Sequence, residues 1–324
     1  MNTTANQLSY REAINQALFE EMKRDQSVIL YGEDVAVWGG IFKVTEGLLD
    51  AFGEKRVRDT PISEQAIIGT AIGAAMTGLR PVVEIMFGGM MLTAFDGIFM
   101  KLGMWKQTFF LPKLPVVVRT TCGGAAGPEH SLSPEALLIQ SPGLQVAAPS
   151  TPAQAKGLLK TAIRNDEPVI FLEHLMLYWS HGPVPAEEYL IPFGQAEITR
   201  KGKDVTIVTY SGMVNKAISA AEELSKEGIE AEIVDLRTLV PLDETAILES
   251  VKKTGKLVIA HEAMERGGMA GEITAIVVDK AFDYLDAPIK RVAAKNVPLS
   301  HSLALNEIII PQTADIVAAV KSLF

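Results

Sequence analysis

The chain has 324 residues, of which 48% are hydrophobic, and its formal net charge is −9 at pH 7. This length is ample for a large core and favours two domains over one. The acidic balance argues against nucleic acid and anionic membrane surfaces as partners, because both attract basic patches. The single cysteine, Cys122, and a polar N-terminal segment without an uninterrupted apolar core predict a cytoplasmic protein.

The first half of the chain alternates helical and strand patterns. An amphipathic helix is expected over residues 10–24, and SVILYGEDV follows as a short buried strand that ends in Gly-Glu-Asp, as strands do before functional loops. Thr151 and Pro152 are typical of a helix start in TPAQAKGLLKTAIRN. Further β-branched runs are RPVVEIMF, LPVVVRTT, LQVAAPS and EPVIFLEH.

The most apolar run, residues 66–79, is interrupted by Gly and Thr and is shorter than the roughly 20 residues that span a bilayer. We predict a buried helix here. Its small residues would also permit close approach of another backbone.

Between residues 183 and 203 the alternation gives way to a stretch rich in proline and charge, and a smaller α/β pattern restarts with DVTIVTYSG. We therefore expect an α/β fold of two mainly parallel-sheet domains, residues 1–190 and 191–324. The chain contains neither the glycine-rich dinucleotide fingerprint nor a P-loop, and GGMAGE at residues 267–272 follows no pattern that binds phosphate specifically.

A lone carboxylate, Glu64 in DTPISEQ, directly precedes the apolar run. One interpretation is structural: Ser63 caps the helix and Glu64 stabilises its positive end, by about 0.3 to 1 kcal/mol. The other is a chemical role. The residues alone favour the structural interpretation.

Two long blocks, GGIFKVTEGLL through VVEIMF (residues 39–87) and PEHSLSPEALL through VIFLE (residues 128–173), carry a resemblance. They closely resemble the β subunit of the thiamine-diphosphate-dependent first component of 2-oxoacid dehydrogenase complexes, the family of pyruvate, branched-chain and acetoin dehydrogenases. The similarity extends from about residue 10 to the C-terminus. It implies a pyrimidine-binding domain followed by a transketolase C-terminal-like domain.

The resemblance gives two residues a catalytic role. In that family the Glu of the ISE motif hydrogen-bonds the aminopyrimidine ring of thiamine diphosphate, and Glu64 matches it. A proton shared with a ring nitrogen stabilises the imino tautomer, whose nitrogen can then remove the thiazolium proton. His130 matches the His of the HSQ block and is expected to help handle reaction intermediates, although an ordinary loop histidine remains the alternative.

Ile62, Phe87 and Met90 are the further cofactor contacts that the resemblance implies. Met90 stands where many members have an aromatic residue, and its thioether could still cover the ring, but a core methionine is an equal alternative. Leu132 replaces the Gln that commonly follows His-Ser. FMKLGMWKQTFFLPKLP replaces a polar segment, which suggests either a larger, more apolar acyl group or a repacked subunit contact.

The segment TAIRNDEP resembles the potassium-binding turn of the family, and Ala162, Ile163, Asn165 and Glu167 match the ligands by position. Oxygen-only ligation suits a hard cation. Asn165 replaces the Asp of well-known members, so a capped helix end is the competing interpretation.

The other histidines suggest no metal site. His261 and Glu262, in IAHEA, match a segment of the family's C-terminal domain that is mainly structural and interfacial. His174, His181 and His301 match no motif.

The family's diphosphate and magnesium are bound through a GDG motif, which this chain lacks. The resemblance therefore implies that an α subunit holds them, in an α2β2 heterotetramer that decarboxylates a small 2-oxo acid and acylates the lipoyl group of an acyltransferase. Two alternatives stay open: the β half of a split transketolase or carboligase, and a non-catalytic scaffold. Retention of Glu64 and His130 argues against the scaffold.

Overall fold

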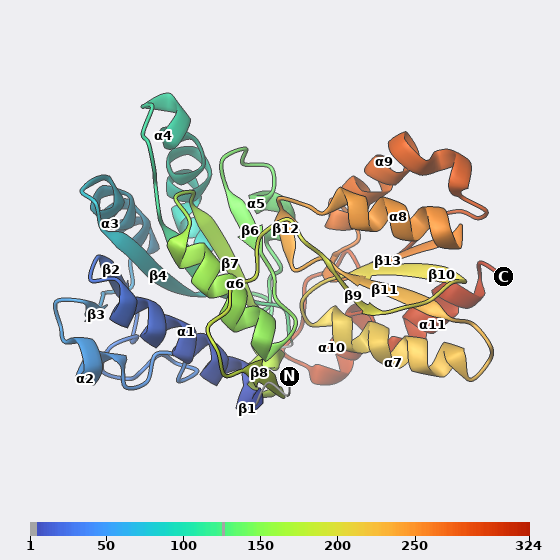
Figure 1. The fold of residues 1–324 in the computed structure, drawn as a ribbon, viewed down its shortest axis with the longest axis horizontal. Coiled ribbons are helices and arrows are strands. Elements are labelled where there is room, and N and C mark those ends of the chain that lie inside the picture. Colours follow the sequence, from blue (N-terminus) through green and yellow to red (C-terminus); the bar gives the residue numbers. More distant parts are fainter. Residues whose placement is uncertain (1–4, 125–126) are drawn as a thin grey trace.

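The computed structural model describes residues 5–124 and 127–324, which form two α/β halves that lie side by side (Figure 1). The N-terminal half contains a seven-stranded sheet in the order β12-β6-β7-β5-β4-β2-β3, in which only β12 runs antiparallel to its neighbour. Its strands are β2 (Val28–Gly32), β3 (Val57–Asp59), β4 (Arg80–Phe87), β5 (Val117–Cys122), β6 (Gln145–Ala147), β7 (Val169–His174) and β12 (Thr238–Val240).

Helices cover both faces of this sheet. On one face α1 packs against α6, and on the other α3, the segments η1 and η2, and α5 contribute to a second cluster of buried side chains. The helical segments of this half are α1 (Tyr10–Arg24), α2 (Leu48–Phe52), α3 (Glu64–Met76), η1 (Met90–Ala94), η2 (Asp96–Leu102), α4 (Gly103–Thr108), α5 (Glu135–Leu138), α6 (Pro152–Arg164) and η3 (Leu175–Trp179). Strands β5 and β7 are buried along their whole length, as expected when helices cover both faces.

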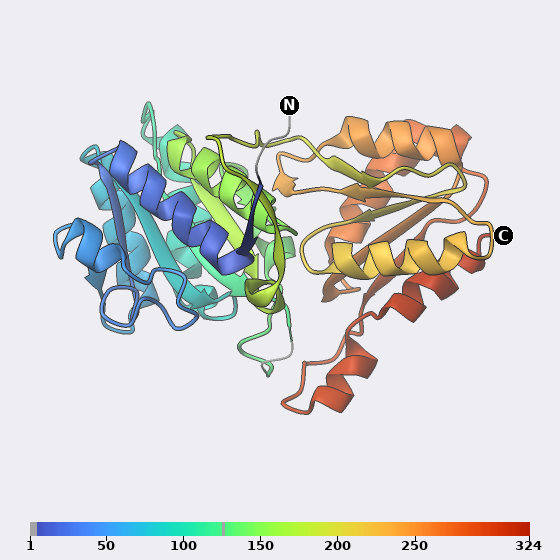
Figure 2. The ribbon, with the colours of Figure 1, turned by 60° about the horizontal axis from the view of Figure 1, so that its bottom comes forward.

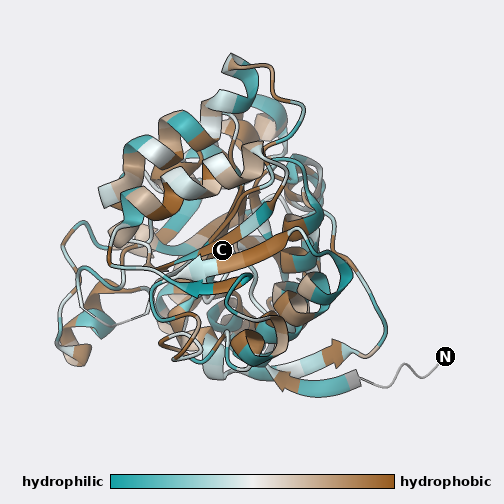
Figure 3. Cartoon of the chain, turned by 90° about the vertical axis from the view of Figure 1, so that its left-hand side faces the viewer, coloured by the Kyte–Doolittle hydropathy of each residue, from teal (hydrophilic) through white to brown (hydrophobic). Residues whose placement is uncertain are grey.

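The C-terminal half contains a five-stranded sheet in the order β14-β13-β10-β11-β9, and β9 alone runs antiparallel to its neighbour. Its elements are β9 (Glu197–Arg200), β10 (Val205–Thr209), α7 (Met213–Ser225), β11 (Ala231–Asp235), α8 (Glu244–Thr254), β13 (Leu257–Met264), α9 (Met269–Ala281), η4 (Phe282–Tyr284), β14 (Lys290–Ala294), α10 (Leu303–Ile309) and α11 (Thr313–Lys321). A separate two-stranded ribbon pairs β1 (Ala5–Ser9) with β8 (His181–Pro185). Figure 2 shows the helices on the outside of the sheets, and Figure 3 shows that the strands between them are largely hydrophobic.

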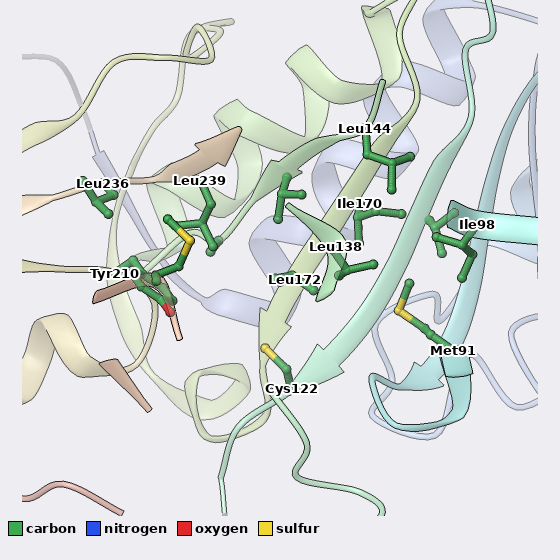
Figure 4. Packing of buried hydrophobic residues seen from close by; sticks show 14 of the residues in the cluster. Met91, Ile98, Cys122, Leu138, Leu144, Ile170, Leu172, Tyr210, Leu236 and Leu239 are labelled. Carbon is green, nitrogen blue, oxygen red and sulfur yellow. The ribbon is translucent and has the colours of Figure 1, made fainter. Parts of the chain in front are cut away.

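One apolar core runs across both halves. It extends from Met91 and Ile98 through Leu172 at the centre to Tyr210 and Leu239 (Figure 4). Tyr210 directly follows β10, and Leu239 lies in β12. The predicted α/β architecture with two mainly parallel sheets is confirmed. The boundary between residues 190 and 191 stays a prediction.

Helix α3 departs from the sequence prediction. Ile67, Ile68 and Ile72 are buried as expected, but the opposite side of the helix, which includes Ala66 and Gly69, is exposed. The predicted buried helix is buried on one side only, because the hydrophobicity of this run comes largely from small residues, which an exposed helix face tolerates. The predicted cap is wrong, since the Ser63 side chain makes no capping hydrogen bond.

One described segment, Leu303–Lys321, is long and apolar enough by length and composition to cross a membrane. It consists of α10 and α11, which Pro311 separates, and α11 packs against α7 and β14 with Ile316 and Val320 fully buried. Helix α11 therefore contributes to the core of the C-terminal half, whereas α10 exposes Leu303, Leu305 and Ile308.

A buried carboxyl group joins the two halves and makes stability depend on pH. Asp235, at the end of β11, accepts hydrogen bonds from Ser150 Oγ at 2.5 Å and Gln154 Nε2 at 2.8 Å. Burial raises the pKa of Asp235 from 3.8 to about 6, although these donors oppose the shift. Folding therefore favours the protonated form, and this stabilisation is complete below pH 3.8 and is lost as the pH rises through 6.

We expect the Asp235→Asn variant to lose this pH dependence. The wild-type free energy of unfolding should fall, relative to the variant's, by about 2 to 2.5 kcal/mol between pH 4 and pH 7, since one pKa unit corresponds to about 1.4 kcal/mol. Urea unfolding of both proteins at several pH values measures the difference. Parallel pH curves for the two proteins would refute this assignment.

Candidate active site

Four adjacent parallel strands, β3, β2, β4 and β5, end at one edge of the N-terminal sheet. The segments after three of them carry most of the predicted site residues: residues 60–64 follow β3, residues 88–90 follow β4, and residues 127–130 follow β5. Glu33 follows β2 at the same edge. The carboxyl edge of a parallel sheet is where α/β proteins bind ligands.

Glu64 is the first residue of α3 and is half-buried. The loop before it is fixed to β2 by a hydrogen bond from Thr60 N–H to the Gly32 carbonyl at 2.9 Å. In the part of the chain that the structure describes, the Glu64 carboxylate makes no hydrogen bond and no ion pair. It is therefore an acceptor with free capacity at the mouth of the site.

Two further carboxylates shape this edge. Asp59, the last residue of β3, accepts hydrogen bonds from the Ala36 and Val37 amides at 2.6 and 3.1 Å and so fixes the loop after β2. In that loop, burial raises the pKa of Glu33, and the negative charge of Glu64 raises it further. Sequence reasoning did not single out Glu33, although the Gly-Glu-Asp ending of its strand was the available signal.

The structure brings Phe87 and His130 together. Their ring centroids lie 4.3 Å apart with an interplanar angle of 45°. The turn after β4 permits this contact because Gly88 and Gly89 have no side chains: a Cβ on Gly89 would lie 2.4 Å from the carbonyl oxygen of Glu129. The glycine pair in MFGGMM therefore lets two loops pack backbone against backbone.

The remaining predicted contacts lie around this core of the site. Met90 begins η1, which packs against α3, and its side chain is half-buried. Ile62 is 82% exposed. Among the described residues, no hydrogen bond, ion pair or ring contact joins Glu64 to His130. A groove of about 610 Å³ lies between α3 and the β2–β3 edge of the sheet, and Ser63, which precedes Glu64, and Tyr31 line it.

The close approach at Gly89 leads to a stability prediction. Its φ of −64° suits any residue, so Gly89→Ala tests the contact with Glu129 alone. We expect a loss of about 1 to 3 kcal/mol in urea unfolding, as for other overpacking substitutions. Gly271→Ala is the matched control, because a Cβ there meets nothing within 4 Å and alanine favours the helix. A Gly89→Ala protein as stable as Gly271→Ala would contradict the contact.

The predicted potassium ligands lie elsewhere, at the amino-terminal edge of the sheet beyond α6. The carbonyl oxygens of Ile163 and Asn165 accept hydrogen bonds from Arg80 Nη1 at 3.1 and 2.8 Å, and Glu167 pairs with Lys106. The amide of Asn165 also donates to the carbonyl of Ala162 at the end of α6. This geometry is that of a capped helix end with a guanidinium in place of a metal ion, and the role in potassium binding stays a prediction.

The histidine of IAHEA is structural. His261 is fully buried, its Nδ1 lies 3.0 Å from the Ala263 carbonyl oxygen, and burial lowers its pKa to about 4. Across residues 5–124 and 127–324, no group of three or more His, Cys, Asp or Glu side chains is arranged to hold a metal ion.

Comparison with known families agrees with this geometry. Residues 6–179 match the pyrimidine-binding domain of transketolase, and residues 194–316 match the transketolase C-terminal domain. The chain is 47% identical to the β subunit of acetoin:2,6-dichlorophenolindophenol oxidoreductase from Cupriavidus necator, with 98% of this chain and 97% of that protein covered. It is 46% identical to the pyruvate dehydrogenase E1 component subunit β of Rickettsia felis, with 97% and 98% covered.

A third relative is the 2-oxoisovalerate dehydrogenase subunit β of Bacillus subtilis, which is 45% identical over 90% of both chains. The chain belongs to this family of 2-oxoacid dehydrogenase β subunits. The predicted family, fold class and enzyme class are thereby confirmed. Thiamine diphosphate is the cofactor of the family, and a β subunit works with an α partner.

A solved structure entitled "Split gene transketolase, inactive beta4 tetramer" is also similar to this β subunit. Its TM-score is 0.80 at 27% sequence identity, over 98% of both chains. The dehydrogenase β subunits are considerably more similar in sequence, so the transketolase alternative is not favoured.

Proposed function

We propose that this β subunit supplies the pyrimidine half of a thiamine diphosphate site in a cytoplasmic α2β2 enzyme. The enzyme decarboxylates a small 2-oxo acid and transfers the acyl group to the lipoyl group of an acyltransferase. The α subunit holds the diphosphate and magnesium. The observation that carries this proposal is Glu64, a half-buried carboxylate at the carboxyl edge of the sheet that has no partner in the described chain.

The surface around Glu64 supports an α partner at this edge. Val37 and Trp38 in the loop after β2 are 78% and 66% exposed, and Ile62 beside Glu64 is 82% exposed. Clustered exposed apolar side chains are typical of protein interfaces. The groove between α3 and the β2–β3 edge adjoins the same surface and has an apolar lining that includes Ile67. A second subunit would bury Glu64 and exclude water from it.

The side chains of this site fit the pyrimidine end of the cofactor. Glu64 offers a carboxylate that can share a proton with a ring nitrogen, and Phe87 and His130 offer ring faces nearby. Thiamine diphosphate, when bound, supplies the carbon nucleophile for the 2-oxo group and accepts the electron pair left by carbon dioxide. Excluding water strengthens the hydrogen bond of Glu64, because a shared proton is stabilised more in a medium of low dielectric constant.

Glu33 adds a second proton-exchanging group. Its raised pKa keeps it protonated at a higher pH than an ordinary glutamate, next to the Glu64 carboxylate. We propose that Glu33 keeps the negative charge at this edge low enough for both carboxyl groups to lie in one site.

The unusual apolar segment is better explained by a subunit contact than by a larger acyl group. It forms the end of η2 and the helix α4, and the residues after α4, Phe109 and Phe110, are 55% and 93% exposed. Phe110 also adopts a positive φ of 52°. Apolar side chains directed to solvent are typical of a surface that a partner covers.

Reconstitution with the α subunit tests the proposed reaction. We expect thiamine-diphosphate-dependent release of carbon dioxide from short 2-oxo acids, followed by reductive acylation of oxidised lipoamide, whose disulfide takes up the two electrons as one sulfur receives the acyl group. Condensation with an aldehyde acceptor in place of acylation would favour a carboligase, in line with the split transketolase likeness. The absence of any cofactor-dependent turnover would refute the catalytic proposal.

A further inference from the structure

A single carboxylate ties the loop after β5 to the C-terminal half. Glu262, on β13, accepts a hydrogen bond from the Gly124 amide through Oε1 at 2.7 Å. Its Oε2 lies 2.7 Å from Nε2 of His174, the last residue of β7. The side chains of Glu262 and His174 are 11% and 8% exposed, so both contacts are largely shielded from water.

The described residues after β5 include three glycines, which lie on either side of residues 125–126. Gly123, Gly124 and Gly127 all have positive φ values, of 67°, 80° and 95°. Glycine adopts this conformation easily but also loses the most conformational freedom when it is ordered. The His174 ring fills the adjacent space, since a Cβ on Gly123 would lie 2.5 Å from its Nε2. The described glycines therefore depend on contacts from other segments for their conformation.

Those contacts determine where His130 lies. Downstream of the glycines, Glu129 packs against Gly89 and the His130 ring lies against Phe87, both in the N-terminal half. Upstream, the hydrogen-bonded anchor comes from Glu262 in the other half. Contacts therefore hold the described residues on either side of residues 125–126, with Gly124 before them and Glu129 and His130 after them.

Glu262 is ionised in this position. Burial alone would raise its pKa, but the interaction with His174 and the Gly124 amide together hold the pKa below its ordinary value. An ionised acceptor makes a shorter and stronger hydrogen bond to a backbone amide than a neutral one does.

We propose that Glu262 is a positioning residue for the reaction: it holds the loop after β5 so that His130 stays against Phe87 and faces the site. The inference rests on the proposed role of His130 in the reaction. It also means that the C-terminal half contributes to the reaction, because that half supplies Glu262.

Hydrogen exchange of the full chain tests the anchor without any turnover. In Glu262→Ala, the Gly124 amide and the neighbouring loop amides should exchange at least about 10-fold faster, because the protecting hydrogen bond is gone. Glu262→Gln should restore most of the protection, since its amide oxygen still accepts from Gly124. Equal exchange in wild type and Glu262→Ala would overturn the proposal.

Glu197→Ala is the matched control. Glu197 also joins the two halves, accepting from Gln154 Nε2 at 2.9 Å, and among the described residues it makes no hydrogen bond or ion pair with the loop after β5. Its removal should leave loop exchange unchanged. Equal loosening of the loop in Glu197→Ala and Glu262→Ala would show a general weakening of the interface and would overturn the positioning role.

Kinetics of the α–β complex test the consequence for His130. Glu262→Ala should lower kcat about 10- to 100-fold, as a displacement of about 1 Å does, with rescue by Glu262→Gln. In a His130→Ala background the same substitution should change kcat less than about 3-fold, because no positioned group remains. A full additional loss in that background would overturn the proposal. A wild-type complex without turnover would instead refute the proposed function, while hydrogen exchange would still decide whether Glu262 anchors the loop.

Discussion

Replacing Glu64 with glutamine should lower the kcat of the α–β complex by about 100-fold or more, the range expected when a proton-sharing group is lost. The substitution keeps the size of the side chain but removes the carboxylate that can share a proton with the cofactor. The free energy of unfolding of the chain alone should change by less than about 1 kcal/mol, because Glu64 has no partner in the described chain beyond the helix end.

A matched control separates the chemical role from the structural one. Glu272 also lies in the first turn of a helix, α9, and is exposed. Glu272→Gln removes a negative charge from a helix N-terminus, as Glu64→Gln does. It should therefore cause a similar change in the free energy of unfolding and leave kcat unchanged. If Glu64→Gln and Glu272→Gln behaved alike in both assays, Glu64 would be an ordinary helix-end residue.

Replacing Arg119 with methionine should destabilise the chain by about 3 to 5 kcal/mol, the usual cost of leaving a buried charge without its partner. Arg119, on β5, is 1% exposed and lies between two carboxylates on adjacent strands. It donates to Glu173 through Nε at 2.7 Å and Nη2 at 2.8 Å, and to Glu84 through Nη1 at 2.6 Å. Without the guanidinium, two carboxyl groups would face each other inside the sheet.

Urea unfolding of the chain alone measures this loss. Burial already raises the pKa of Glu84, and the negative charge of Glu173 adds to it, while Arg119 opposes both. Neutralising both carboxyl groups in the triple variant Glu84→Gln, Arg119→Met, Glu173→Gln should therefore recover much of the stability. A loss below about 1 kcal/mol for Arg119→Met alone would show that the ion cluster contributes little.

The sequence predicted those elements whose signals are local. Thr151 and Pro152 mark the start of α6, and the Thr151 side chain does accept from the Gln154 amide. The strands are short apolar runs because both faces of each sheet are covered. The exposed side of helix α3 was not predicted because Ala66 and Gly69 carry no periodic hydrophobic signal that would identify it.

The site was predictable only where a motif marked it. Glu64, Phe87 and His130 lie in recognisable blocks, and the structure places all three at one edge of the sheet. The contact between His174 and Glu262 could not be predicted from the sequence, because the two residues are 88 positions apart and lie in different halves of the fold. Similarly, Arg80 lies far along the chain from the carbonyl groups of Ile163 and Asn165 to which it donates. Long-range polar pairs of this kind leave no local pattern.

Cofactor binding tests the central claim most directly. Calorimetry with thiamine diphosphate and magnesium should detect no binding to the chain alone and clear binding to the α–β complex. Circular dichroism of the bound imino tautomer should vanish in a Glu64→Ala complex that remains folded. Binding by the isolated chain, no binding by the complex, or an unchanged imino signal in Glu64→Ala would contradict a site that is divided between two subunits and activated by Glu64.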